Sequence, residues 1–179
     1  MEKAAWTPEG VVGGAYTFNE VYKYIQVDNT DVLSPEQVTA ACWIYPTGHS
    51  GYHGALIKST SGVWGDGYGL TMYSGDSKHI YFFVNAYVYY RVKAPIEMNQ
   101  WAHLVGTYDG KEVRIYKNGK LIESMAYKAK LKTNTSHLYI GQGRSNGYPW
   151  PGAIDEAMLF RRALSAQEVT ALYDRFPHP

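Results

Sequence analysis

The sequence has little cysteine, little net charge and no long apolar run, and each absence excludes a class of protein. Cys42 is the only cysteine, so no disulfide can form within the chain. It lies in an apolar run, which predicts a small core residue rather than a nucleophile. The 17 basic and 16 acidic residues nearly balance, so nucleic acid is not expected as a partner. No apolar run reaches the ~18 residues of a membrane-spanning helix, so no membrane insertion is expected.

Helical periodicity is also scarce. Glycine and proline separate short apolar stretches along most of the chain, which is typical of an all-β sandwich. One helix is predicted over Leu164–Phe176, where Ser165 and Glu168 form a capping box. Ser34 is expected to cap a single helical turn. The predicted strands, the first of them a bent strand or a strand pair, are Ala15–Val27, Val38–Tyr45, Ala55–Ser59, Tyr68–Tyr73, Lys78–Val84, Tyr87–Lys93, Trp101–Asp109, Glu112–Lys117, Lys120–Ala126, His137–Gly141 and Ala153–Phe160. This pattern predicts a single domain over residues 1–179.

Tyrosine, in contrast, is abundant, with 17 residues against five phenylalanines. Three of them fall in the eight-residue stretch NAYVYYRV. Along a strand, Tyr87, Tyr89 and Arg91 would share one face, and the two valines would lie on the other. Because β-branched residues pack well on a buried sheet face, the valine face is assigned to the core. The first three residues are therefore predicted to face outward.

The connection before this strand decides which residues of the preceding strand share its outer face. A two-residue turn at Asn85-Ala86 would place Phe82 and Val84 on the face of Tyr87. A longer loop or a bulge would reverse that pairing. Asn-Ala matches the tight-turn preference for Asn-Gly poorly, so the longer loop is favoured. The residues that it adds to the outer face are Tyr73, Tyr81 and Phe83.

Three segments carry a more specific signal than periodicity. They are VTAACWIYPTG, NQWAHLVGTYDGKEVRIYKNGKLI and IGQGRSNGYPWPGAIDEAMLFRRALSAQEVTALY, with Gly-x-Ile-Asp-Glu before a Leu-Ser helix in the last. In this order they resemble the laminin-G-like, concanavalin-A-like jelly roll, from about Ala15 to Tyr173. The resemblance implies two curved antiparallel sheets packed face to face, with structural roles for Trp43, Trp101 and Trp150.

The resemblance also implies a role outside the cell, as a sugar-binding or adhesion module of a larger multidomain protein. The first ten residues, MEKAAWTPEG, lack the basic and apolar regions of a secretory signal peptide. We therefore expect a module of a longer extracellular or cell-surface protein, with a cytosolic protein as the alternative.

Catalytic motifs are scarce. A retaining glycosidase needs two carboxylates about 5 Å apart, and catalytic relatives commonly alternate acidic residues along one strand. Asp155 and Glu156 are adjacent, so on a strand they point to opposite faces. His49 and His53 lie in a Gly-rich loop, where their spacing gives no shared face for a metal ion. A non-catalytic protein is predicted, while a Ser–His–Asp arrangement and a glycan-cleaving enzyme of the same fold stay open.

A calcium site is implied by the resemblance. The family usually opens with Phe-Asp-Gly-x-x-Asp-Tyr, where this chain has FNEVYKY. In relatives this strand shares a calcium ion with the Asp of Gly-x-Ile-Asp-Glu, here Asp155. Asn19, Asp155 and a backbone carbonyl near Tyr22 are the implied ligands, since calcium accepts carboxylate, amide and carbonyl oxygens. Asn19 in place of the usual Asp removes one charge and is expected to weaken the site, and the Lys23 side chain could occupy the gap instead of the ion. The alternative is a metal-free hydrogen bond or salt bridge from Asp155.

A strip of tyrosines on a concave sheet can stack against sugar rings. Arg91 can bind a carboxylate or sulfate group, or stack on a tyrosine. We therefore expect a carbohydrate-binding module, with a protein-docking module as the alternative. The candidate ligand-binding residues are Tyr73, Tyr81, Tyr87, Tyr89 and Arg91 on strands, and His53, Trp64, Asp66, Tyr68, Arg144 and Asn146 in or beside loops. Tyr52 is a further loop aromatic beside His53.

Overall fold

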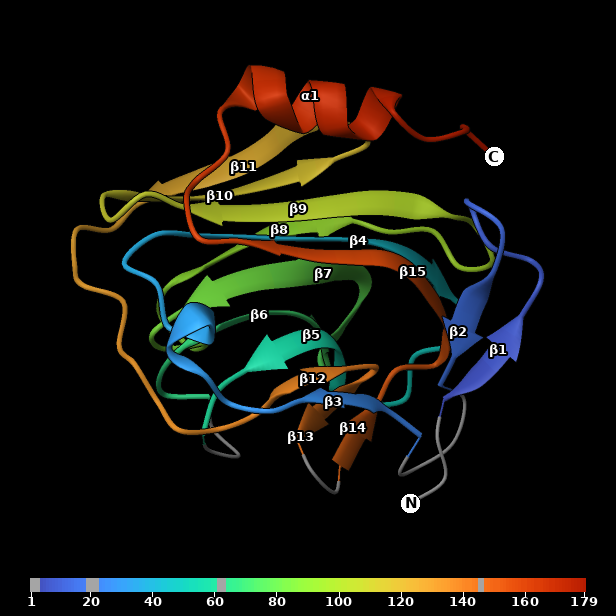
Figure 1. Cartoon of the computed structure of the whole chain (residues 1–179), viewed down its shortest axis with the longest axis horizontal. Helices are drawn as coiled ribbons and strands as arrows, with labels where there is room; N and C mark the ends of the chain where they lie inside the picture. The colour runs from blue at the N-terminus through green and yellow to red at the C-terminus, as the bar shows by residue number, and fades with distance from the viewer. Residues whose placement is uncertain (1–3, 19–22, 61–63, 145–146) are drawn as a thin grey trace.

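Two antiparallel β-sheets lie face to face in the computed structural model of the chain (Figure 1). The structure describes residues 4–18, 23–60, 64–144 and 147–179. Strands that follow one another in sequence are often not neighbours in a sheet, because the chain crosses repeatedly between the two sheets. The predicted fold class, an all-β jelly-roll sandwich with a short C-terminal helix, is confirmed.

The first sheet has seven strands in the order β1-β2-β15-β4-β9-β10-β11. Their bounds are β1 Ala5–Thr7, β2 Ala15–Thr17, β4 Val38–Pro46, β9 Ala102–Tyr108, β10 Glu112–Lys117, β11 Lys120–Ala126 and β15 Gly152–Phe160. The two ends of the chain meet in this sheet, because β15 pairs with β2 on one side and with β4 on the other.

The second sheet has six strands in the order β3-β12-β5-β6-β7-β8. Their bounds are β3 Ile25–Val27, β5 His53–Lys58, β6 Tyr68–Tyr73, β7 Asp76–Val84, β8 Arg91–Pro95 and β12 Leu138–Ile140. A separate hairpin of β13 (Gln142–Arg144) and β14 (Gly147–Pro149) lies beside β5.

The side chains between the two sheets form the main core. Phe82 of β7 and Cys42 of β4 both belong to it. A Cβ atom at Gly106 would lie 2.1 Å from the ring of Phe82, so only glycine lets β9 approach this ring. Cys42 is buried, as predicted, and burial raises the pKa of its thiol to about 12. Trp150 is also fully buried in this core, which confirms its structural role.

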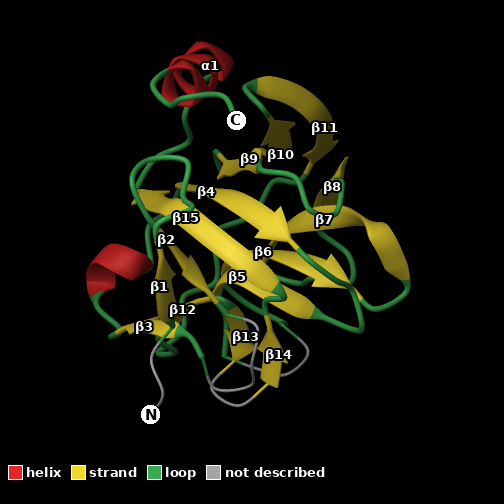
Figure 2. Cartoon of the chain, turned by 90° about the vertical axis from the view of Figure 1, so that its right-hand side faces the viewer, coloured by secondary structure: helices red, strands yellow, loops and turns green. Residues whose placement is uncertain are grey.

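Helix α1 (Ala166–Asp174) covers the outer face of the seven-stranded sheet (Figure 2). The predicted capping box begins it: Ser165 Oγ accepts from the Glu168 N–H, and the Glu168 carboxylate accepts from the Ser165 N–H. Val169 and Leu172 are buried against this face with Trp43, whose structural role is confirmed. The helix is thus held by a local cap and by a second apolar cluster outside the main core.

Two local predictions are wrong. The helical turn near Ser34 is a 3-10 turn, η1 (Asp31–Leu33), which ends at Ser34 instead of beginning there. Residues 87–90 form a turn, so β8 starts only at Arg91. Strands β1, β13 and β14 were not predicted, because three residues are too few to show a period of two.

Residues 127–137 form no strand or helix, and the side chain of Lys58 holds this segment in place. Lys58 is 1% exposed. Its Nζ donates to Asn134 Oδ1 at 2.7 Å, to Asn134 O at 3.0 Å, to Ser136 O at 2.7 Å and to Asn29 Oδ1 at 2.9 Å. Burial lowers the pKa of Lys58, and the charge of Asp66 opposes that effect. A buried ammonium therefore connects three segments that are distant in sequence.

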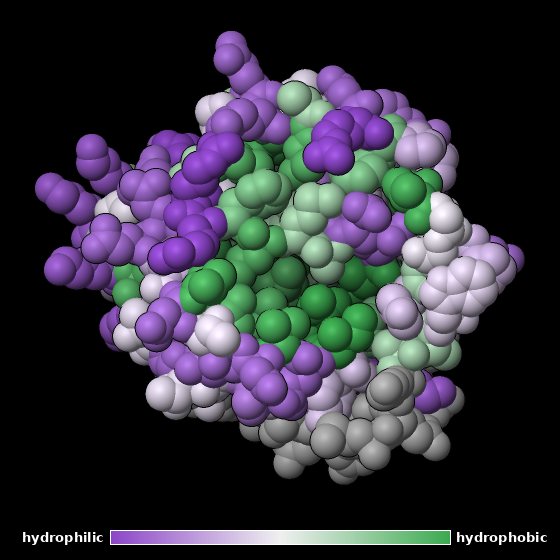
Figure 3. All heavy atoms as spheres, viewed as in Figure 1, coloured by the Kyte–Doolittle hydropathy of each residue, from purple (hydrophilic) through white to green (hydrophobic). Residues whose placement is uncertain are grey.

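The sandwich is open along one edge. Apolar residues gather in the centre of the front face, which is hollowed between β15 and β12 (Figure 3). A cavity of about 250 Å³ between β2, β15, β3 and β12 has Phe18, Ile25, Ile140 and Ile154 among its lining residues. Among the described residues, no helix is both long and apolar enough to cross a membrane.

Candidate functional site

The outer face of the six-stranded sheet, opposite the main core, carries a second set of aromatic side chains. Along β7, Phe82 points into the core while Tyr81 and Phe83 point outward. Along β6, Leu70 belongs to the core and Tyr73 packs with the outer set. The prediction that Tyr73, Tyr81 and Phe83 share the outer face is therefore confirmed.

The turn over residues 85–90 folds Tyr87 back over this face. Asn85 adopts a φ of 59°, and its Oδ1 accepts from the Lys132 N–H at 2.6 Å. The Tyr87 N–H donates to Trp64 O at 3.0 Å, and the Tyr87 side chain is only 4% exposed. Tyr89, in contrast, is 74% exposed. The prediction that Tyr87 and Tyr89 share one strand face with Arg91 is wrong, because the chain turns before the strand begins.

Tyr87 and Tyr52 are the centre of a group of rings that we call the tyrosine cluster. The ring of Tyr87 lies 5.2 Å from that of Trp64 and 5.6 Å from that of Phe83, measured between centroids. Tyr52 lies 5.3 Å from Tyr148, on β14. The cluster consists of Tyr52, Trp64, Tyr73, Tyr81, Phe83, Tyr87 and Tyr148. Tyr52, Tyr73 and Tyr148 are half-buried, so they form its accessible part.

The guanidinium of Arg91 lies over the cluster. Its central carbon is 4.4 Å from the ring centroid of Tyr87, 4.7 Å from that of Tyr81 and 5.1 Å from that of Tyr73. Within the described ranges, Arg91 has no carboxylate partner. The hydroxyl of Tyr87 is buried there and makes no hydrogen bond to any described residue. Burial raises the pKa of Tyr87, and the charge of Arg91 opposes this. The hydroxyl therefore stays protonated and can donate a hydrogen bond.

One carboxylate borders the cluster. Asp76 Oδ2 accepts from the Tyr81 hydroxyl at 2.6 Å and lies 2.8 Å from His79 Nδ1 and 3.6 Å from Lys93 Nζ. Burial acts to raise the pKa of Asp76, but the hydrogen bonds from Tyr81 and His79 outweigh it, so that the pKa is lowered. This carboxylate is ionised and paired with its neighbours. Lys93, partly exposed, adds a second positive charge beside Arg91.

Three predicted ligand-binding residues have structural roles. Trp64 is 2% exposed at the base of the cluster, and its Nε1–H donates to Gly143 O at 3.2 Å. Tyr68 is buried in the main core, where its hydroxyl donates to Leu33 O. Asp66 accepts hydrogen bonds from Ser59 Oγ and the Thr60 N–H within its own loop. Trp64 and Tyr68 are buried and leave a ligand no accessible surface, so these two predictions are corrected. Asp66 is half-buried, and its ligand contact stays a prediction.

The two loop histidines bind backbone atoms. His53 is buried and lies on β5, with Nδ1 2.5 Å from Pro149 O and Nε2 accepting from the Ser50 N–H at 3.1 Å. Both ring nitrogens of His53 are therefore occupied, and its predicted ligand contact is corrected. His49 Nε2 lies 2.7 Å from Tyr73 O. Burial lowers the pKa of His53, which keeps its ring neutral.

For the remaining predicted residues, the structure gives only their position. Arg144 ends β13, and Asn146 lies outside the described residues. Tyr52, a loop aromatic that the sequence places beside His53, and Tyr148 both belong to the tyrosine cluster. Their side chains enter the cluster through loop and hairpin packing, which no local sequence pattern signals.

The residues of the implied calcium site are described only in part, since Asn19 and Tyr22 lie outside the described residues. Asp155 is buried and accepts three backbone N–H groups: Oδ2 from Val11 and Val12, and Oδ1 from Glu156. The two oxygens of a carboxylate offer about four acceptor positions, and three of those of Asp155 are thus occupied. No group of three or more candidate ligand side chains occurs among the described residues. The described part alone does not fit a calcium shell, and the calcium site stays a prediction.

Comparisons with known proteins agree with this architecture. The model of the concanavalin A-like lectin/glucanases superfamily matches residues 19–170. Because the match covers most of the sequence, the chain belongs to this superfamily, and the resemblance drawn from its motifs is confirmed. No curated protein matches the chain in sequence.

Several solved structures share the fold. Domain 4 of AbnA, a GH43 extracellular arabinanase from Geobacillus stearothermophilus in complex with arabinotriose, has a TM-score of 0.74 and 18% identity, over 97% of this chain and 82% of that one. The CBM40 of the Ruminococcus gnavus IT-sialidase, bound to α2,3-sialyllactose, has a TM-score of 0.66 and 17% identity, over 87% and 99%. The binding domain of Paraclostridial Mosquitocidal Protein 1 has a TM-score of 0.73 and 14% identity, over 96% and 45%. The chain thus spans less than half of this last structure. Identities this low show a common fold.

Proposed function

We propose that this chain is a non-catalytic carbohydrate-binding module whose binding site is the tyrosine cluster with Arg91. The observation that carries the proposal is the contact between Arg91 and Tyr87. A guanidinium without a carboxylate partner in the described part of the chain lies over the ring of a tyrosine whose buried hydroxyl is unpaired there. A ligand with a carboxylate or sulfate group would give Arg91 the charged partner that it lacks.

The accessible rings of the cluster supply a surface on which a sugar ring can stack. Tyr52, Tyr73 and Tyr148 are half-buried, so each ring is fixed by its neighbours and still reaches the surface. Fixed aromatic rings bind with little loss of side-chain entropy. Lys93 is offset by Asp76 and by Glu123, whose carboxylate accepts from the Lys93 N–H. Arg91 is therefore the charge that favours a glycan with an anionic group.

The chemistry beside the cluster supports binding rather than hydrolysis. Asp76 is the one carboxylate that the described residues place against the cluster rings, and three side chains already pair with it. Paired-carboxylate hydrolysis needs a second acid within ~5–10 Å. The printed names of two structural neighbours, one with arabinotriose and one with sialyllactose, add support for a sugar ligand. The first of them belongs to an extracellular enzyme, which supports a module of an extracellular or cell-surface protein.

The test is binding to an array of neutral and acidic glycans, with each hit measured for variants. Arg91→Ala should weaken binding about tenfold or more, since hydrogen bonds to charged groups contribute about 1.5–3 kcal/mol. Arg91→Lys should fall between, because lysine lacks the two-pronged donor geometry. Arg161→Ala removes an exposed arginine elsewhere and should change nothing. Tyr73→Ala should weaken binding, with the exposed Tyr16→Ala as its control.

Two results would overturn the proposal. New reducing ends or unsaturated uronates from any glycan would show that the chain is catalytic. A blank array, with folded protein, would favour protein docking, for which Val88 at 62% and Tyr89 at 74% exposure offer an apolar contact beside the cluster.

A further inference from the structure

A second hollow lies on the opposite side of the molecule, on the outer face of the seven-stranded sheet. Register places a row of residues across it: Ala153 of β15 pairs with Tyr45 of β4 on one side and with Thr17 of β2 on the other. Ile44 pairs with Ala102, so Trp101 comes beside Tyr45. Because Ala153 in the middle of this row is small, a gap remains between the aromatic rings of Tyr45 and Trp101 on one side and Thr17 on the other.

The gap is a cavity of about 220 Å³. Its lining residues are Thr7, Glu9, Thr17, Tyr45, Thr47, Trp101, Gly152 and Ala153. Ala153 and Gly152 form the floor. A Cβ atom at Gly152, where φ is 129°, would lie 1.9 Å from Tyr45 O, so no side chain can fill the floor from that position. The hollow is therefore fixed by backbone pairing and does not depend on the rotamer of a long side chain.

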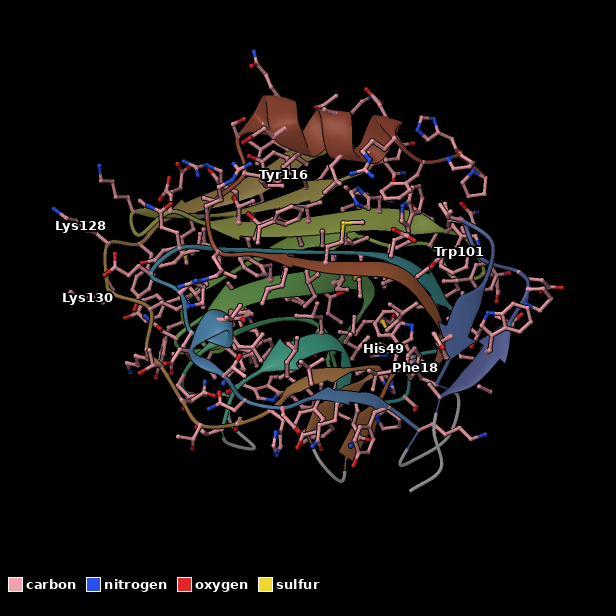
Figure 4. All side chains as sticks on the ribbon, in the orientation of Figure 1. Phe18, His49, Trp101, Tyr116, Lys128 and Lys130 are labelled. Atoms are coloured by element: carbon pink, nitrogen blue, oxygen red, sulfur yellow. The ribbon has the colours of Figure 1, made fainter. Side chains whose placement is uncertain are left out.

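The aromatic wall is Trp101 with Tyr45, whose ring centroids lie 5.5 Å apart at 53°. Both side chains are partly exposed. Trp101 packs against the apolar cluster of Trp43, as its predicted structural role requires, and also offers part of its indole to the hollow. Within the described ranges, neither the Trp101 indole N–H nor the Tyr45 hydroxyl has a hydrogen-bond partner. Figure 4 shows Trp101 at the end of the sheet where β1 and β2 lie.

The rest of the lining is polar. Thr17 lies across Ala153 from Tyr45, Thr7 belongs to the neighbouring β1, and Thr47 directly follows β4. The exposed Glu9 forms no ion pair with any described residue. Glu9 is the only charged residue in the lining. A carboxylate can accept from two neighbouring hydroxyls at once, and an indole face packs against the C–H face of a sugar ring. Thr7 Oγ1 accepts from the Glu9 N–H and Thr17 Oγ1 donates to Ala5 O, so Thr7 can still donate and Thr17 can still accept a further hydrogen bond. A sugar hydroxyl can use both of these positions, and a quaternary ammonium can use neither.

We propose that this hollow is a second binding site, specific for one ring of a neutral sugar. Trp101 and Tyr45 would stack on the ring, Glu9 would accept from two adjacent hydroxyls, and the threonines would complete the hydrogen bonds. An anionic sugar is repelled by Glu9. The site lies on the other sheet from the tyrosine cluster and is independent of it.

The test is a two-dimensional ¹H–¹⁵N spectrum of the tryptophan indole groups during titration with arabinotriose, xylotriose and cellotriose. The Trp101 signal, assigned by its loss in Trp101→Phe, should shift saturably with at least one sugar. The signals of the buried Trp43 and Trp150 should stay, and Arg91→Ala should leave the shift intact. Glu9→Gln should weaken binding about tenfold.

Ala153→Leu is the decisive variant, because it fills the floor and leaves Trp101 and Glu9 in place. It should abolish the shift while the rest of the spectrum shows a folded chain. No shift with any of the three sugars, or a shift that survives Ala153→Leu, would overturn the proposal. A shift with choline and with none of the sugars would overturn it too, in favour of a cation site.

Discussion

The Oδ2 atom of Asp155 accepts a hydrogen bond from the backbone N–H of Val11 at 2.8 Å, across 144 residues of sequence. With the further bonds from Val12 and Glu156, this side chain ties the segment between β1 and β2 to β15. A Cβ atom at Gly10 would lie 2.9 Å from the same oxygen, which shows how closely the backbone wraps this carboxylate.

Asp155→Asn should lower the free energy of unfolding by about 1–3 kcal/mol, because an amide nitrogen cannot accept and leaves a buried N–H without a partner. Urea denaturation measures this loss. Asp174→Asn, an exposed aspartate at the end of α1, is the matched control and should change stability little.

The calcium site implied by the sequence predicts a separate effect on the same region. An ion that binds only the folded chain raises its Tm, so calcium should raise the Tm and EGTA should lower it. Differential scanning calorimetry compares the two conditions directly. An identical Tm in both would show that prediction wrong, and Asp155 would act only as an acceptor of backbone N–H groups.

Lys58→Met should be among the most damaging single changes outside the apolar core. It preserves the length of the side chain but removes the only donor that Lys58 offers to four oxygens of Asn29, Asn134 and Ser136. We expect a loss of more than about 3 kcal/mol in the free energy of unfolding. Lys128→Met is the control, since Lys128 is exposed and extends away from the sandwich (Figure 4). A small effect at Lys58 would mean that residues 127–137 are held by other contacts.

His103 should make stability depend on pH. Burial lowers its pKa to about 4, from 6.5 in an exposed histidine, so the folded chain holds the ring neutral. Its contribution is complete above pH 6.5 and is lost as the pH falls toward 4, because the unfolded chain binds the proton first. The full effect is about 3 kcal/mol. His103→Phe keeps an aromatic ring against Trp43 and Tyr173 and should flatten the pH profile of unfolding in that window. A profile parallel to the wild type would contradict this, since His53 and the other groups are common to both proteins.

Local signals predicted most of the fold. Asp109-Gly110 and Asn118-Gly119 form turns as expected, with φ of 87° at Gly110, 49° at Asn118 and 76° at Gly119. Their preference for left-handed backbone is a property of the residues themselves. The capping box of α1 is equally local. Such features were predictable because they depend on neighbours within four residues.

The candidate site depended on contacts that sequence does not display. NAYVYYRV has the alternation of a strand, yet Asn85 turns the chain because its side chain bonds residues 130 and 132, far along the sequence. The packing of Trp101 was predicted, but its exposure to the second hollow was not, because register across β4, β15 and β2 cannot be deduced from one strand. The sequence correctly predicted that Tyr81 and Phe83 of β7 point outward. It did not predict how deeply the rings are buried or which rings they contact, because both depend on tertiary packing.

The burial of Lys58 also means that chemical labelling of this residue can measure how often residues 127–137 open. Amine-specific reagents react with unprotonated, solvent-accessible amino groups, whereas the Lys58 ammonium is buried among amide and carbonyl oxygens. Exposed lysines such as Lys128 and Lys130 should be modified within the first moments of labelling. Lys58 can react only when the segment 127–137 lifts away, so the slow appearance of label on this one residue, read by mass spectrometry, would time that opening directly.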